Sequence, residues 1–447
     1  MSSLIYRIES LLSCVLSRVG VGTNVDLFLL FWALLSGRFL QSRGGVFPAL
    51  SLFGLPDEAV RRCGAALCYG RWEIADLAAP FEAQVRTEGH WQPCSYGGFR
   101  PVAVDVTGFY RPCLKECPTK HYCAEAGKAL PAIPVGILAK VGGVGGQRLA
   151  LPICLVRPDP NDPTERQLLC RLLRAAREQV GEDEAGVFDR GFPLRDVLEL
   201  GPRQFVVRLP RNFTARRAAP PPYKGAGRRP KRGETVRPLS RTYKGKALPA
   251  APPDRTEAWT ETTGEQTLGL RAEVWEGLVL PDADPSDPKT VQFRVAAIYD
   301  PRFTEPLLVA TLLRVSGADL RGLYLERWPV EGLPLVAKVI LGAGRQFVFA
   351  EESRQRLPEL ALLAGAILSY LAATQEAVPS GFWDRAPRPT AGRLRRVLSR
   401  VHFQDLGVLP KELRKKDSPT AHLPKGVLAH RRQKRSKQET SGVPLAA

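Results

Sequence analysis

An alternation of apolar runs over residues 100–212 limits most strongly how this 447-residue chain can fold. Three runs have the length and composition of strands: PVAVDVT, ALPAIPVGILAKVG and RLALPICLVR. The Gly-rich GGVGG between the second and third run predicts a hairpin turn, because no helix follows it at once. After them come an amphipathic helical stretch, PTERQLLCRLLRAAREQV, and two more predicted strands, in GVFDRG and QFVVRLP. Strands that alternate with a helix in this way predict an α/β core.

Two of the predicted strands carry a carboxylate near the end of an apolar run. Asp105 lies in PVAVDVTGFY, and Asp189 follows Val187 and Phe188 in EAGVFDRGFP. An Asp at the end of a strand often caps a turn, so either residue alone is weak evidence for a site.

A third motif, YLERWPVEGLPLVAK, concentrates four chemically different side chains. At 100° per residue they fall within one sector of a helical wheel: Tyr324, Arg327, Glu331 and Lys338. A phenol, a guanidinium and an ammonium around a carboxylate can grip a phosphate beside a metal ion. Two prolines interrupt the pattern. We expect Pro329 to begin a new helix and Pro334 to kink it.

Together the three motifs resemble those of bacterial insertion-sequence transposases of the DDE type, which carry a Tyr-Arg-Glu-Lys signature. Asp105 and Thr107 match the family's Asp-x-Thr form, and Asp189 begins a segment similar to its Asp-Arg-Gly-Phe motif. The long gap before Glu331 resembles the cut-and-paste branch that has a β-rich insertion there. The resemblance implies an α/β fold with a ribonuclease-H-like catalytic core, interrupted by a β insertion and flanked by helical N- and C-terminal regions.

The resemblance also implies a chemistry. Asp105, Asp189 and Glu331 would be the catalytic residues and would bind two Mg²⁺ ions, with Mn²⁺ as an alternative. Two such ions about 3.5–4 Å apart can activate a water and stabilise a leaving oxygen. Tyr324 and Arg327 would contact the phosphate near the cleaved end, and Lys338 the DNA backbone. The expected partner is double-stranded DNA, both the transposon ends and the target, bound by a dimer.

A net charge of +19 independently favours a polyanionic partner, most simply nucleic acid, although RNA or an anionic membrane surface fits the charge as well. The basic residues cluster in ARRAAPPPYKGAGRRPKRG, which its Pro and Gly content marks as a loop. The candidates for DNA binding there are Arg216, Arg217, Arg228, Arg229, Lys231 and Arg232. A solvated basic loop is the alternative.

Composition divides the chain into six segments. Residues 1–95 are mainly helical, either as DNA-end-binding helices or as a plain helical domain. Residues 96–212 form the first part of the core, 213–305 the basic loop and β insertion, and 306–345 the second part of the core. Residues 346–392 form C-terminal helices, and 393–447 a basic, disordered tail. The resemblance also makes Trp259 and Trp275 candidates for stacking on a flipped base, as some relatives with this insertion do, but core or surface positions are favoured.

The apolar run LFLLFWALL is too short to span a membrane, so we expect a buried helix and a cytoplasmic protein without membrane contact. Nine scattered cysteines do not suggest a disulfide framework. One cluster has side chains that bind Zn²⁺: Cys94, Cys113, Cys117, His121 and Cys123. It lacks a Cys-x-x-Cys pair, which favours reduced, partly buried thiols.

Three functional hypotheses remain open at this point. The first is a transposase that binds the terminal inverted repeats of its element, cleaves them and transfers strands. The second is a nuclease or domesticated recombinase of the same fold that cuts without strand transfer. The third is an inactive derivative that only binds nucleic acid.

Overall fold

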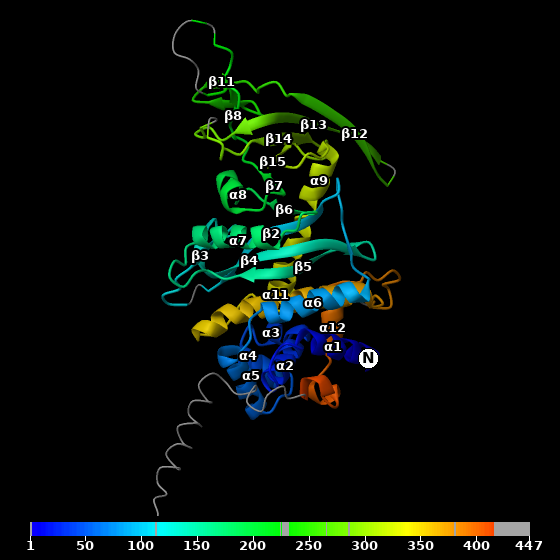
Figure 1. The fold of residues 1–447 in the computed structure, drawn as a ribbon. Helices are drawn as coiled ribbons and strands as arrows, with labels where there is room; N and C mark the ends of the chain where they lie inside the picture. The colour runs from blue at the N-terminus through cyan, green and yellow to red at the C-terminus, as the bar shows by residue number, and fades with distance from the viewer. Residues whose placement is uncertain are drawn as a thin grey trace, which may run out of the picture.

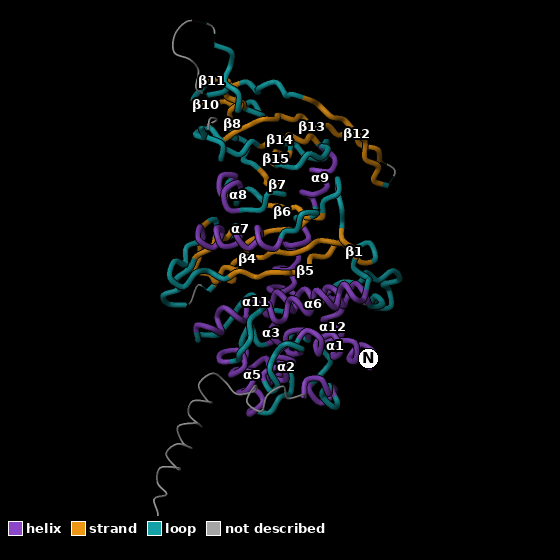
Figure 2. Tube along the Cα trace, in the orientation of Figure 1, coloured by secondary structure: helices purple, strands orange, loops and turns teal. Residues whose placement is uncertain are grey.

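The computed structural model describes residues 2–111, 114–223, 225, 232–264, 266–284, 287–379 and 381–414. Figure 1 shows an elongated molecule with a bundle of helices at one end, a strand-rich region at the other and long strands between them. Figure 2 shows the same division, with most of the helices gathered at one end of the molecule and strands prevailing at the other.

Five strands form the centre of the sheet, in the order β5-β4-β2-β6-β7. They are β2 (Arg100–Tyr110), β4 (Lys128–Val144), β5 (Gln147–Val156), β6 (Glu184–Phe188) and β7 (Phe205–Arg208). β4 is antiparallel to both β2 and β5, whereas β6 is parallel to both β2 and β7. The prediction of an α/β fold is confirmed, with a large mixed sheet.

Local sequence explains the hairpin between β4 and β5. Gly145 and Gly146 have φ angles of +54° and +80°, which glycine adopts without steric cost. Two successive residues with positive φ are typical of the tight turn whose twist suits a β-hairpin. The short edge strands β1 (Gln92–Pro93) and β3 (Lys120–Cys123) also pair with β4.

Helices α7 (Glu165–Gln179) and α8 (Leu194–Leu200) pack together on one face of the sheet. The Thr164 hydroxyl accepts a hydrogen bond from the Gln167 amide and so begins α7 with an N-cap. The apolar side of α7 is buried against Val104 of β2 and Leu138 of β4. Since side chains alternate along a strand, Asp105 faces away from α7.

The predicted β insertion lies between β7 and β15 and extends the same sheet. The strands of this region are β8 (Ala215–Arg217), β9 (Thr235–Val236), β10 (Arg241–Tyr243), β11 (Lys246–Leu248), β12 (Arg255–Thr263), β13 (Gln266–Val279) and β14 (Phe293–Tyr299), and β15 (Leu307–Thr311) follows them. β10 and β11 pair with each other in a separate two-stranded sheet. β15 pairs antiparallel with β7, and β14, β13 and β12 follow in turn. Pairing with β15 satisfies the backbone groups on the outer edge of β7, which would otherwise be exposed.

The helical end combines the two ends of the described chain in one hydrophobic core. The predicted N-terminal helices are α1 (Ser2–Val15), α2 (Thr23–Leu35), α3 (Arg38–Gln41), α4 (Val46–Leu52), α5 (Asp57–Tyr69) and α6 (Ala75–Glu88). Of these, α2 and α5 pack against α11 (Glu351–Thr374), which also contacts β4 and β5. Of the helices described, α11 alone is long and apolar enough to cross a membrane, but 83% of its apolar window is buried inside the protein.

Residues 393–414 are folded, although the sequence predicted a disordered tail there. They lie in α12 (Ala391–Leu398) and in two single turns, η3 (Phe403–Leu406) and η4 (Lys411–Arg414). Leu394, Leu398 and Val401 are buried in the helical core, so a few apolar residues suffice to fold this basic segment. The remainder of the predicted tail lies outside the described residues.

A buried ion pair joins α11 to the sheet. Glu359 of α11 is fully buried, and both its oxygens accept hydrogen bonds of 2.6 Å from Arg157, which follows β5. Burial raises the pKa of Glu359 although Arg157 opposes the shift. The pair therefore anchors the helical bundle to the core at a point where an unpaired charge would be costly.

We expect Arg157→Met to destabilise the protein by about 3–5 kcal/mol at neutral pH, because it leaves Glu359 buried and unpaired. The loss should shrink as the pH falls toward the usual pKa of a carboxyl group, since a protonated Glu359 carries no charge. Urea unfolding at pH 7.5 and pH 5 measures both effects. Arg195→Met, which breaks an exposed pair with Asp282, should cost no more than about 1 kcal/mol. Equal losses in both variants would contradict this role of Arg157.

Candidate active site

The parallel pairing of β2 with β6 brings two of the predicted carboxylates to the same level of the sheet. Val104 is the register partner of Phe188, so Asp105 and Asp189 are the next residues on neighbouring strands. Val104 and Phe188 both point into the core beneath α7, and alternation therefore directs Asp105 and Asp189 to the opposite face. Neighbouring strands lie about 4.8 Å apart, which keeps the two carboxylates close.

The signature segment covers that face as an irregular helical run. It consists of α9 (Gly317–Leu325), the 3₁₀ turn η1 (Trp328–Glu331), α10 (Gly332–Leu335) and the π turn η2 (Val336–Ile340). Pro329 lies within the first residues of η1, in agreement with the expected new start. Downstream of Pro334 the Leu341 amide bonds to the Val336 carbonyl, the wider spacing of a π turn.

Four of the predicted residues interact electrostatically around Asp105. Burial raises the pKa of Asp105 to about 6, and the negative charges of Asp189 and Glu331 act in the same direction. Arg327 and the Val106 amide, which donates a 2.9 Å hydrogen bond to Asp105, oppose that shift. The structure thus brings Asp105, Asp189, Glu331 and Arg327 together, although they are distant in sequence.

Arg327 forms a salt bridge with Glu331 inside this group. Its Nη2 donates a 2.7 Å hydrogen bond to Oε1 of Glu331, one helical turn away, and only 6% of the Arg327 side chain is exposed. Burial alone would lower the pKa of Arg327, but Tyr324, Glu331 and Asp105 outweigh this effect and raise it. The neighbouring Glu326 is buried and accepts a 2.6 Å hydrogen bond from Tyr96.

Tyr324 and Lys338 also lie beside the site but point into the protein. Tyr324 is buried, and its hydroxyl has no hydrogen-bond partner among the residues described. Lys338 donates a 2.7 Å hydrogen bond to the Thr107 hydroxyl, two residues after Asp105. Burial lowers the pKa of Lys338 to about 8, against the attraction of Asp105. In this conformation neither side chain presents its polar end on the surface for DNA.

The donor set suits Mg²⁺, which prefers carboxylate oxygens, but the arrangement is not preformed. No three His, Cys, Asp or Glu side chains in the described ranges lie close enough to hold one metal ion. The reason is visible in two contacts. Oδ1 of Asp189 accepts a 2.6 Å hydrogen bond from the Gly191 amide, and Glu331 is held by Arg327. Glu331 would have to leave Arg327 to become a ligand.

The basic candidates of the insertion have different positions. Arg232 is exposed, whereas Arg228, Arg229 and Lys231 lie outside the described residues. Arg217 instead binds Asp254 through two hydrogen bonds of 2.6 and 2.8 Å, and Arg216 donates to the Gly233 carbonyl. Both of these arginines thus hold the insertion together.

The two tryptophans of the insertion have structural positions, as favoured from the sequence. Trp275 is fully buried and donates to the Ala251 and Pro252 carbonyls. Trp259 packs partly buried against the core beneath α9.

The cysteine cluster does not form a metal site among the residues described, and Cys113 lies outside them. His121 faces Glu165 at 3.3 Å, Cys117 donates to the Thr119 carbonyl, and Cys94 lies near Glu326. Every described cysteine is a free thiol, in agreement with the absence of a disulfide framework.

Sequence patterns missed the residues that hold α9 in place. Arg321 contacts Asp300 and Glu261, and the Gly317 amide donates to Glu257. The partners of Arg321 and Gly317 lie in β12 or directly after β14, far from α9 in sequence. The charge of Arg321 was the only local sign of these contacts.

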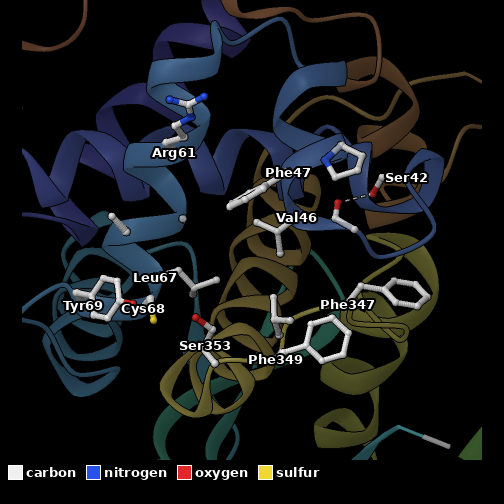
Figure 3. Close-up of a pocket in the computed structure, with 16 residues that line it drawn as sticks. Ser42, Val46, Phe47, Arg61, Leu67, Cys68, Tyr69, Phe347, Phe349 and Ser353 are labelled. Carbon is white, nitrogen blue, oxygen red and sulfur yellow. Dashed lines mark hydrogen bonds between the residues drawn. The ribbon is translucent and has the colours of Figure 1, made fainter. Parts of the chain in front are cut away.

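A pocket of about 720 Å³ lies elsewhere, at the helical end (Figure 3). Phe47, Leu67, Phe347 and Phe349 surround it, and Arg61 lies at its side. Its lining residues include no carboxylate or imidazole, the side chains that most often bind a catalytic metal ion. The carboxylate group around Asp105 is therefore the candidate active site.

A scan of protein-family models finds none that matches this chain, and a search of curated proteins finds no similar sequence.

We expect Asp105→Asn to stabilise the metal-free protein by about 1–3 kcal/mol at pH 8. The raised pKa of Asp105 favours folding below its usual value of 3.8, and this contribution is lost as the pH rises through about 6. Asparagine avoids the buried charge and can still accept from the Val106 amide. Urea unfolding in EDTA at pH 8 and pH 4 tests this, and the difference should vanish at pH 4. A variant less stable than the wild type at pH 8 would contradict the prediction.

Proposed function

We propose that this protein is a DDE transposase that binds the terminal inverted repeats of an insertion sequence and catalyses metal-dependent cleavage and strand transfer. The observation that carries the proposal is the convergence at one site of Asp105, Asp189, Glu331 and Arg327 from three separate motifs. A structural ion pair needs only one carboxylate. This site instead has two carboxylates in register on adjacent strands and a third beside them. A site of this kind is a candidate for metal-assisted phosphoryl transfer.

The sheet supports a ribonuclease-H-like core. The order β5-β4-β2-β6-β7 combines a three-strand antiparallel meander with two further strands that are parallel to its first strand. This is the arrangement expected from three hairpin-like strands followed by helix–strand units. The β insertion between β7 and β15 agrees with the branch of the family that the long gap before Glu331 indicates.

In the proposed mechanism the side chains bind, orient and stabilise. Asp105, Asp189 and Glu331 would hold two Mg²⁺, or Mn²⁺, which supply an activated water and stabilise the leaving oxygen. Arg327 would orient the phosphate through its planar guanidinium. A phosphate bound to Arg327 would compete with Glu331 for the same donors and so free that carboxylate. Positioning and charge stabilisation are the main tasks of a protein in phosphoryl transfer.

The net charge of +19 supports double-stranded DNA as the partner, both at transposon ends and at the target. We further propose that the protein acts in the cytoplasm as a dimer on DNA. The alternatives are a nuclease without strand transfer and an inactive DNA-binding derivative. Terminal repeats in the DNA on either side of the gene would favour the transposase over the nuclease.

We expect Asp105→Asn, Asp189→Asn and Glu331→Gln each to abolish cleavage of a duplex that carries the flanking repeat. Each removes a negative charge that metal binding needs, whereas the DNA is held by Lys and Arg. In each variant we therefore expect cleavage in Mg²⁺ to be lost while duplex affinity, measured by fluorescence anisotropy, is retained. Asp183→Asn is the control, because Asp183 is an exposed residue beside β6 that pairs with Arg100. Wild-type cleavage by any of the three variants would remove that residue from the site.

Arg327→Lys tests the orientation of the phosphate. Lysine keeps the charge but cannot reproduce two parallel hydrogen bonds from one plane. We expect cleavage at saturating protein to fall about 10–100-fold, because positioning controls the rate, with a much smaller change in duplex affinity. If Arg327 only pairs with Glu331 to stabilise the fold, Arg327→Lys should leave the cleavage rate unchanged.

A further inference from the structure

The β insertion grips α9, the helix that leads into the proposed active site. Arg321 lies in the middle of α9 and is 8% exposed. Its guanidinium donates to Oδ2 of Asp300 at 2.6 and 3.2 Å, and Nη1 donates to both oxygens of Glu261 at 2.8 and 3.0 Å. Glu261 belongs to β12, and Asp300 directly follows β14.

A second contact fixes the start of the same helix. Oε2 of Glu257, also in β12, accepts a 2.6 Å hydrogen bond from the Gly317 amide at the first turn of α9. A negative charge at this position is also favourable to the helix dipole. The approach is close, because a Cβ on Gly317 would lie 2.5 Å from the Cβ of Ala272 in β13.

These contacts control the direction of the residues that follow. Tyr324 and Arg327 come one and two turns after Arg321, and α9 packs against β6, the strand that leads to Asp189. On the opposite side, Tyr96 packs on Gly322 and donates to Glu326, so α9 is held from two directions. A rotation or shift of α9 would carry Arg327 and Glu331 away from Asp105.

We infer that Arg321 is a positioning residue, through which the β insertion sets the placement of Arg327 and Glu331 at the proposed active site. The inference rests on the proposed function for its effect on cleavage, but its structural part does not. Arg321 touches none of the reacting groups. It acts through α9, and the β insertion is thereby a structural support for the site as well as a part of the sheet.

Arg321→Gln should leave the protein folded, because Asp300 keeps two 2.8 Å hydrogen bonds from Arg302. Glu261→Gln is a milder variant, since Glu261 is partly exposed and Arg321 retains Asp300. Arg271→Gln is the matched control. Arg271 pairs with Glu273 in β13 of the same sheet, at 2.7 Å, and stacks on Tyr299.

The first measurement needs no activity. Hydrogen exchange of the full-length protein without DNA should be faster over residues 317–331 in Arg321→Gln, and to a smaller degree in Glu261→Gln. Exchange in α11 should not change, and Arg271→Gln should match the wild type throughout. Unchanged protection of residues 317–331 in Arg321→Gln would overturn the inference, as would an equal increase in α11, which indicates general destabilisation.

The second measurement is cleavage of the repeat-bearing duplex at saturating protein and Mg²⁺. We expect Arg321→Gln to be about 10–100-fold slower than the wild type, with duplex affinity within about twofold, since a misplacement near 1 Å costs this much. Wild-type cleavage by Arg321→Gln would overturn the positioning role. If the wild type itself cleaves no duplex, the proposed function fails, and the hydrogen-exchange result decides the placement of α9 by itself.

Discussion

The in-register parallel pairing of β2 with β6 is the constraint on which the candidate site depends. It brings the residues after Val104 and Phe188 to the same level and the same face of the sheet, so that their carboxylates lie close together. A shift of the register by one residue would turn Asp105 or Asp189 into the apolar core beneath α7. Burial of the neighbouring apolar residues on that side therefore fixes both the strands and the position of the two charges.

Placing carboxylates together in a partly buried site has an electrostatic cost, which Arg327 reduces. It stabilises the ionised form of Asp105 and binds Glu331 directly. Arg327 holds Glu331, and the Gly191 amide donates to Asp189, so both carboxylates have partners without a metal ion. In the function proposed for this site, a phosphate and a cation of matching charge would replace several of these partners, which a purely structural ion-pair network does not require.

The sequence predicted those features that depend on local periodicity and order. Apolar patterns predicted several elements with bounds correct to within a few residues. These are the strands around Asp105 and Asp189, the helix at residues 165–179 and the buried helix at residues 351–374. The burial of Tyr324 and the hydrogen bond of Lys338 to Thr107 could not be predicted, because they depend on how α9 and η2 are placed against strands far away in sequence. Arg321 was missed because its partners Asp300 and Glu261 are 21 and 60 residues away and belong to different strands. The folded segment after residue 393 was missed because its buried apolar side chains are few among many basic ones.

The position of α11 at the centre of the helical bundle has a consequence for how the chain folds during synthesis. Helices α2 and α5 leave the ribosome long before α11 exists, and both pack against it in the finished bundle. At roughly 5–20 residues per second this interval lasts on the order of tens of seconds. In that time the nascent N-terminal region presents apolar surface that has no native partner, while the strands of the sheet emerge and pair. Completion of the bundle is therefore a late, post-sheet event, and the nascent chain is most exposed to aggregation, and most in need of chaperones, before residue 374 is made.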